Sequence, residues 1–123
     1  MNSVALSHLT AEEQAALAAF TTLVQDPFPG RILSVTLFGS NARGDADIES
    51  DIDLLLLVDD ESRSLRSALW RFASDLSLKD NLVLSVRVYA QARWAASRRM
   101  RLPLDRAMVA DGIPLPIQRI AVP

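Results

Sequence analysis

Five consecutive apolar residues, Leu54–Val58, constrain the fold of this chain more than any other feature of the sequence. The run is far shorter than the ~20 residues that a membrane-spanning helix needs. A β-strand that is buried on both faces has this pattern, because neither face needs polar side chains. The segment 53–58 is therefore predicted to be a central strand of a sheet that other elements cover.

The segments on either side of this run have the periodicity of the covering elements. Thr10 and Glu13 form a capping box that opens a helix over 11–25. Strands are predicted over 32–38, with Leu33, Val35 and Leu37 on the buried face, and over 82–89. An apolar stripe predicts a second helix between the last two strands, and its members are Leu65, Ala68, Leu69, Phe72 and Leu76. This order predicts an α/β (α+β) fold, with a small three-stranded mixed sheet and flanking helices.

Length and composition limit the remaining possibilities. The 123 residues are predicted to form a single domain, with a core over about 11–90 and a helical or irregular C-terminal part over 91–123. The chain has no cysteine and one histidine, His8, which excludes thiol chemistry and argues against a histidine-dependent triad. Trp70 and Trp94 are predicted to be packing residues. The acidic residues 59–61 are predicted to favour the N-terminus of the helix that follows.

Charge is distributed unevenly along the chain. Residues 1–86 have a net charge of −7 and residues 87–123 a net charge of +5. Solvated helix faces are the favoured interpretation of the basic segment, over a docking surface. The overall charge of −2 does not favour direct nucleic-acid binding. Residues 1–10 have neither a basic region nor a long apolar stretch, so no signal peptide is expected. The shortness of the apolar runs predicts no membrane association, and a cytoplasmic location is the default expectation.

Two carboxylates precede the central apolar run. Asp51 and Asp53 lie two residues apart at the start of the predicted strand, so their side chains project to the same face. Paired carboxylates repel one another unless a cation lies between them, and oxygen-only pairs suit Mg²⁺ bound together with substrate phosphates. A lone Asp-x-Asp is more often an acidic strand edge.

An anion-binding turn follows the preceding strand. Gly39 permits close backbone approach, Ser40 can donate a hydrogen bond to a phosphate oxygen, and Arg43 can add a bidentate contact. By itself a Gly-Ser pair would indicate only a strand-ending turn. Beside a metal pair at the end of a neighbouring strand, it indicates nucleotidyl transfer, in which metal and positioning do most of the catalysis.

The segment resembles the signature of the DNA-polymerase-β-like nucleotidyltransferase superfamily, and in particular its minimal nucleotidyltransferase branch. Gly39-Ser40, ten intervening residues and Asp51-Ile52-Asp53 match the motif, and the resemblance is densest over residues 30–60. It implies the polymerase-β-like fold and a Mg²⁺-dependent transfer of AMP from ATP to a macromolecular hydroxyl. It also implies that Asp51 and Asp53 are catalytic and bind metal, that Gly39 and Ser40 hold the triphosphate, and that the protein partner is a HEPN-type toxin.

One position departs from the family pattern. The family has a third carboxylate on the strand after the intervening helix, where this chain has Ser85, followed by Arg87. Serine cannot replace a carboxylate as a metal ligand or general base at neutral pH. Two functions therefore stay open: an antitoxin that adenylylates its partner, and a catalytically silent module of the same fold that neutralises its partner by occlusion.

Overall fold

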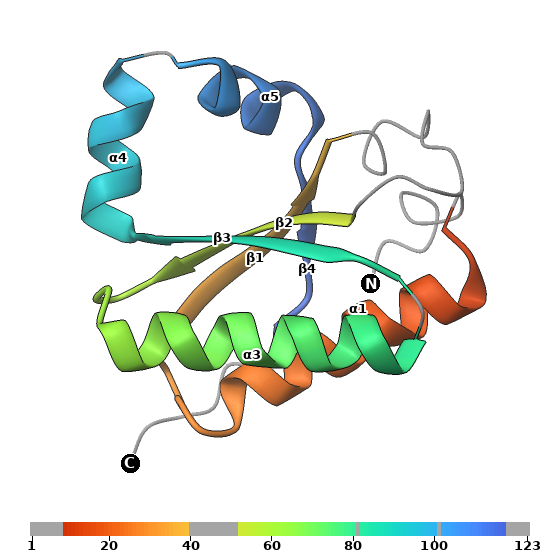
Figure 1. Cartoon of the computed structure of the whole chain (residues 1–123). Helices are drawn as coiled ribbons and strands as arrows, with labels where there is room; N and C mark the ends of the chain where they lie inside the picture. Colours follow the sequence, from red (N-terminus) through yellow and green to blue (C-terminus); the bar gives the residue numbers. More distant parts are fainter. Residues whose placement is uncertain (1–8, 40–51, 81, 101, 118–123) are drawn as a thin grey trace.

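The computed structural model describes residues 9–39, 52–80, 82–100 and 102–117. It contains the strands β1 (Ile32–Phe38), β2 (Ile52–Val58), β3 (Leu84–Ala90) and β4 (Ile113–Leu115), which form one mixed sheet in the order β3-β2-β1-β4. Helices α1 (Ala11–Gln25) and α3 (Arg63–Asp80) cover one face, and α4 (Gln91–Arg99) and α5 (Pro103–Asp111) lie on the other (Figure 1). The predicted mixed sheet with flanking helices is confirmed.

Helix α1 begins where the capping box predicts. The Glu13 N–H donates to Thr10 Oγ1 at 3.0 Å, and the Thr10 N–H donates to Glu13 Oε1 at 2.8 Å, so two amides at the helix start are satisfied. Leu17, Phe20 and Val24 are buried against the sheet. Both predicted ends of this helix are correct.

The central strands agree with the sequence pattern except at one residue. Strands β1 and β2 are antiparallel, β2 and β3 are parallel, and α3 forms the connection between the parallel pair. The register of β1 and β2 shifts between Ile32 and Ser34, which is a bulge. The bulge places Ile32 in the core and leaves Leu33 exposed, so the prediction that Leu33 shares the buried face of Val35 and Leu37 is wrong.

The C-terminal segment is more ordered than the sequence predicts. Helices α4 and α5 follow β3, and β4 then pairs antiparallel with β1, with Leu115 opposite Val35. The sheet therefore has four strands instead of the predicted three. Because β4 is an edge strand, it can include Pro114, whose missing N–H would break the ladder of a central strand.

Apolar side chains are buried on both faces of the sheet. The larger cluster joins α1 and α3 to the sheet, and a smaller one contains Phe38, Leu55 and Trp94 of α4, with Tyr89 packed against it. Trp94 is thus a packing residue, as predicted. Trp70 is not, because it is 46% exposed and lies against the Arg66 guanidinium at 5.3 Å from the ring centroid.

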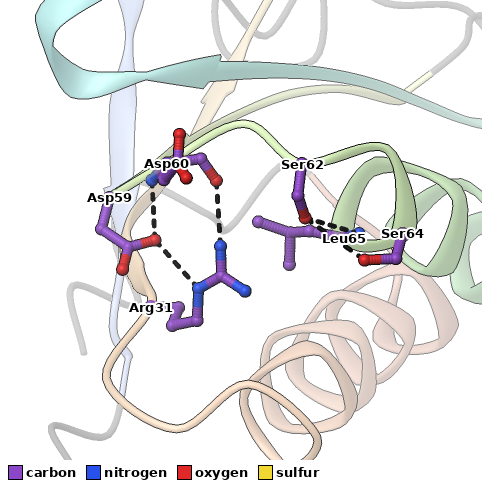
Figure 2. Close-up of polar contacts among 6 residues, drawn as sticks. All are labelled: Arg31, Asp59, Asp60, Ser62, Ser64 and Leu65. Carbon is purple, nitrogen blue, oxygen red and sulfur yellow. Dashed lines mark hydrogen bonds and ion pairs between the residues drawn. The ribbon is translucent and has the colours of Figure 1, made fainter.

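The acidic residues that precede α3 do not occupy its first turn (Figure 2). Ser62 Oγ accepts from the Leu65 N–H at 3.1 Å and is the N-terminal cap. Asp59 Oδ1 instead accepts from Arg31 Nε at 3.1 Å, and Arg31 Nη2 also donates to the Asp60 carbonyl at 3.1 Å. These contacts join the start of β1 to the end of β2. Arg31 therefore holds the Asp59 side chain, and Ser62 is the residue that caps α3. That the charge of residues 59–61 favours this helix terminus stays a prediction.

Candidate active site

Gly39 and Asp53 meet where the chain leaves β1 and enters β2. Phe38, the last residue of β1, lies opposite Asp53 in the antiparallel register. Gly39 follows with φ +77°, a conformation that L side chains rarely adopt. A Cβ at this glycine would lie 2.5 Å from Asp53 Oδ2. Glycine is therefore required here for two reasons, the backbone conformation and the close approach of the carboxylate.

Ser85 is the neighbour of Asp53 on the other side. The parallel register pairs Asp53 with Ser85 and Leu55 with Arg87, and directly paired residues project to the same face of a sheet. Asp53 and Ser85 are both half-buried, whereas Arg87 is exposed. The register therefore places Ser85 beside Asp53, with Arg87 on the same face of the sheet.

Three of the predicted site residues lie outside the described part of the chain: Ser40, Arg43 and Asp51. His8 does as well. Among the residues that the structure describes, no group of three acidic, histidine or cysteine side chains could bind a metal ion. The observed part of the site is therefore a carboxylate, a glycine turn and a serine hydroxyl on three neighbouring backbone segments. These are hard oxygen donors beside a turn that can approach phosphate closely, a set that fits magnesium and a nucleotide.

Glu61 connects α3 with the junction of β3 and α4, a role that the sequence does not indicate. Its Oε1 lies 2.7 Å from Nη1 of Arg66 in α3 and 2.7 Å from Nη1 of Arg93 in α4, and Oε2 accepts from the Ala90 N–H at 2.9 Å. Burial raises the pKa of Glu61, but the Ala90 hydrogen bond and the two arginines outweigh it, so the net pKa is lowered. Because these partners lie up to 32 residues away, no local sequence pattern indicates the contact.

Glu61 should make the stability of the chain sensitive to acid. A carboxyl whose pKa is lower in the folded chain stabilises the fold above its ordinary pKa of about 4.5, and this contribution is lost as the pH falls through the folded pKa. We expect Glu61→Gln to lower the free energy of unfolding by about 1–2 kcal/mol at pH 7, with partial screening by solvent. Urea unfolding at pH 7 and pH 3 should show the difference from native shrinking at pH 3. A pH-independent difference would contradict the prediction, and Glu12→Gln, at an exposed glutamate, is the control.

Gly39→Ala should damage nucleotide binding as well as stability. The left-handed φ costs an L residue about 1–2 kcal/mol, and the new methyl group must displace the Asp53 carboxylate. Gly30→Ala is the matched control, because Gly30 has φ 74° at the opposite end of β1. We expect both variants to unfold at lower urea concentrations and only Gly39→Ala to lose affinity for Mg-ATP in calorimetry. Equal affinity of the two variants would separate Gly39 from the nucleotide site.

Several solved structures have a similar fold. The chain covers 99% of a candidate minimal nucleotidyltransferase, with 89% of its own residues aligned, 25% identity and a TM-score of 0.50. It also aligns over 89% of its length with 76% of a chain from a toxin–antitoxin complex with AMP-PNP, at 22% identity and a TM-score of 0.55. A variant of the MntA–HpeT toxin–antitoxin complex gives 21% identity and a TM-score of 0.54, over 84% of this chain and 73% of that one. The fold is therefore the polymerase-β-like nucleotidyltransferase fold that the sequence motif implies.

Two sequence relatives match part of this chain. Two proteins of Methanocaldococcus jannaschii, MJ0604 and MJ0141, are named as candidate protein adenylyltransferases. They are 45% and 43% identical to this chain over 47 and 56 residues, or 38% and 45% of its length. The chain spans about half the length of each, 47% and 57%. The model of the nucleotidyltransferase domain family matches residues 18–105, which include the Gly39 turn, Asp53 and Ser85. With motif, fold and family model in agreement, the chain belongs to the nucleotidyltransferase domain family.

Proposed function

We propose that this chain is a magnesium-dependent nucleotidyltransferase that transfers AMP from ATP to a protein acceptor. The observation that carries the proposal is the position of the Asp53 carboxylate, directly against the Gly39 turn where β1 and β2 meet. A metal-binding carboxylate and a phosphate-binding turn must be neighbours for nucleotidyl transfer. The names of the two archaeal relatives support adenylate as the transferred group.

Each site residue has a proposed role. Asp51 and Asp53 bind the magnesium ion, which when bound neutralises charge on the phosphates, and they are the catalytic residues. Gly39, Ser40 and Arg43 bind the triphosphate, through backbone approach, a hydroxyl hydrogen bond and a guanidinium contact. The oxygen of the acceptor hydroxyl forms a bond to the α-phosphorus of ATP while the bond between that phosphorus and the oxygen bridging to the β-phosphorus breaks. Pyrophosphate leaves with the electron pair of the broken bond, and the hydroxyl proton passes to water.

The proposed acceptor is a HEPN-type toxin, and this chain is its antitoxin. The support is the sequence signature together with the fold shared with chains of toxin–antitoxin complexes, one of them solved with AMP-PNP. A small domain has little surface for recognising an acceptor alone, so a partner that brings its own recognition surface fits its size. The proposal includes a cytoplasmic location, where ATP and magnesium are available.

A second candidate function is neutralisation of the partner without chemistry. The observation that favours it is the hydroxyl of Ser85 beside Asp53, at the position where the family pattern has a carboxylate. In this case the chain keeps the fold and the nucleotide-site residues but acts by covering the partner. Both functions require a protein partner, and they differ in whether the partner becomes labelled.

The test is transfer of labelled nucleotide to the partner. The chain is incubated with magnesium and ATP labelled at the α-phosphate, together with a purified HEPN-type protein as the candidate acceptor. We expect the label to appear on the partner, and ATP labelled at the γ-phosphate to give none, because the β- and γ-phosphates leave as pyrophosphate. Neutralised partner without label would favour occlusion. Label from γ-labelled ATP would contradict adenylyl transfer.

A further inference from the structure

Strand β3 has an open edge. It is the outermost strand, next to β2 alone, and the Ile52 N–H donates to the Val83 carbonyl at 2.9 Å. In a parallel pair, every second residue of a strand directs both its N–H and its C=O toward the neighbouring strand. Because Val83 directs its carbonyl toward β2, the odd-numbered residues of β3 pair with β2, and the even-numbered residues direct their N–H and C=O groups to the open side. Two outward amides are occupied by side chains: the Leu84 N–H donates to Ser77 Oγ at 3.0 Å, and the Ala90 N–H donates to Glu61.

Between these two occupied positions lie Val86 and Val88. In the part of the chain that the structure describes, no backbone or side-chain group pairs with their outward amides and carbonyls. Unpaired edges of this kind are templates for another strand. A groove of about 240 Å³ runs along this segment, and it is lined by residues 86–89 of β3, Arg66 and Trp70 of α3, and Arg93 of α4.

The groove contains three arginines and no acidic lining residue, in a chain whose overall charge is −2. Glu61 holds Arg66 and Arg93 at 2.7 Å each, and Arg93 also lies 4.5 Å from the centroid of the Tyr89 ring. These contacts fix two guanidinium groups, one from α3 and one from α4, near the Ala90 end of the open edge, which reduces the conformational entropy lost on binding. Arg87 is exposed and forms no ion pair among the described residues, so its charge is available to a ligand.

From this arrangement we propose that the groove along β3 is a docking site for an extended acidic segment of a partner protein, which adds to the sheet beside β3. Backbone groups of the added strand pair with Val86 and Val88, the mode known as β-augmentation. Its side chains alternate between the two faces, so acidic side chains on either face meet an arginine, Arg66 on one and Arg87 or Arg93 on the other. A phosphate chain would satisfy the arginines but not the backbone pairs. The site requires no nucleotide and is independent of transfer.

The probe is a short fluorescein-labelled peptide of alternating glutamate and valine, followed by fluorescence anisotropy without ATP. We expect saturable binding that weakens about tenfold in Arg87→Glu, because an attractive contact becomes repulsive. Arg99→Glu is the matched control: it makes the same charge change at an exposed residue that does not line the groove, and should bind as native. Absence of binding to the native chain at millimolar peptide would overturn the proposal.

Two further measurements separate strand addition from charge attraction. A peptide with proline in place of each valine and an N-methyl group on each glutamate amide has the same charge but no backbone donor, and we expect this proline peptide to bind at least tenfold more weakly. In NMR hydrogen exchange, the alternating peptide should slow exchange of the Val86 and Val88 amides. Equal binding of the proline peptide, or unchanged exchange of the two amides, would overturn the proposal. So would a single-stranded oligonucleotide that binds more tightly than the peptide and loses its binding in Arg87→Glu. Circular dichroism of both variants verifies that they are folded.

Discussion

Replacing Asp51 and Asp53 together with asparagine is expected to abolish magnesium-dependent binding of ATP while the chain stays folded. The two side chains supply the negative charge of the proposed metal site, and asparagine keeps their size without it. A bound metal contributes several kcal/mol to stabilising charge on transferring phosphates, so adenylate transfer should fall by about 10³-fold or more. The free energy of unfolding should stay unchanged or increase, because the substitution removes the repulsion between two neighbouring carboxylates.

Calorimetry with Mg-ATP and urea unfolding of the same samples decide this prediction. The matched control is Asp26→Asn with Asp75→Asn, which removes the same charge at two exposed positions on α1's C-terminal side and α3. The control should bind Mg-ATP as the native chain does. If the Asp51 and Asp53 variant bound with equal affinity, the pair would not be a metal site and the proposed function would lose its foundation.

The elements that the sequence predicts correctly are those whose own residues determine them. Helix α1 has a complete capping box and a regular apolar stripe, and β2 is apolar at every position except Asp53. Strand β4 escapes prediction because it has only three residues with a central proline, and its pairing with β1 alone makes it a strand. The exposure of Leu33 depends on a bulge, which side-chain alternation does not indicate.

The candidate site likewise has residues that the sequence predicts and contacts that it does not. The spacing of the motif identifies Gly39 and Asp53, and counting along β3 identifies Ser85, because strand register follows from alternation once the strands are adjacent. The contacts of Glu61 with Ala90 and Arg93 arise only when α3 and α4 pack at the ends of their strands. The open edge of β3 likewise depends on strand order, which no local pattern contains.

Ser85→Asp is expected to raise adenylate transfer by about 10²–10⁴-fold over the native chain, the usual contribution of general-base assistance. Ser85 is paired with Asp53 in the register of β2 and β3, so a carboxylate there would project to the same face as Asp53. It could then serve as a further metal ligand and accept the proton of the acceptor hydroxyl. The measurement is labelled adenylate on the partner per unit time, with magnesium and ATP present.

Arg87 must be controlled, because it lies two residues further along β3 on the same face and can pair with the new carboxylate. The variant Ser85→Asp with Arg87→Val removes that competitor, and Arg87→Val alone is its reference, since the substitution also changes the β3 groove. If the double variant transfers adenylate faster than Arg87→Val alone, Ser85 occupies the position of the missing carboxylate. This holds even if Ser85→Asp alone does not raise the transfer rate. No rise in either comparison would mean that transfer does not depend on this position. If the native chain is silent and Ser85→Asp restores transfer, the chain is an enzyme that has lost its base and is retained for binding, and occlusion becomes the function of the native protein.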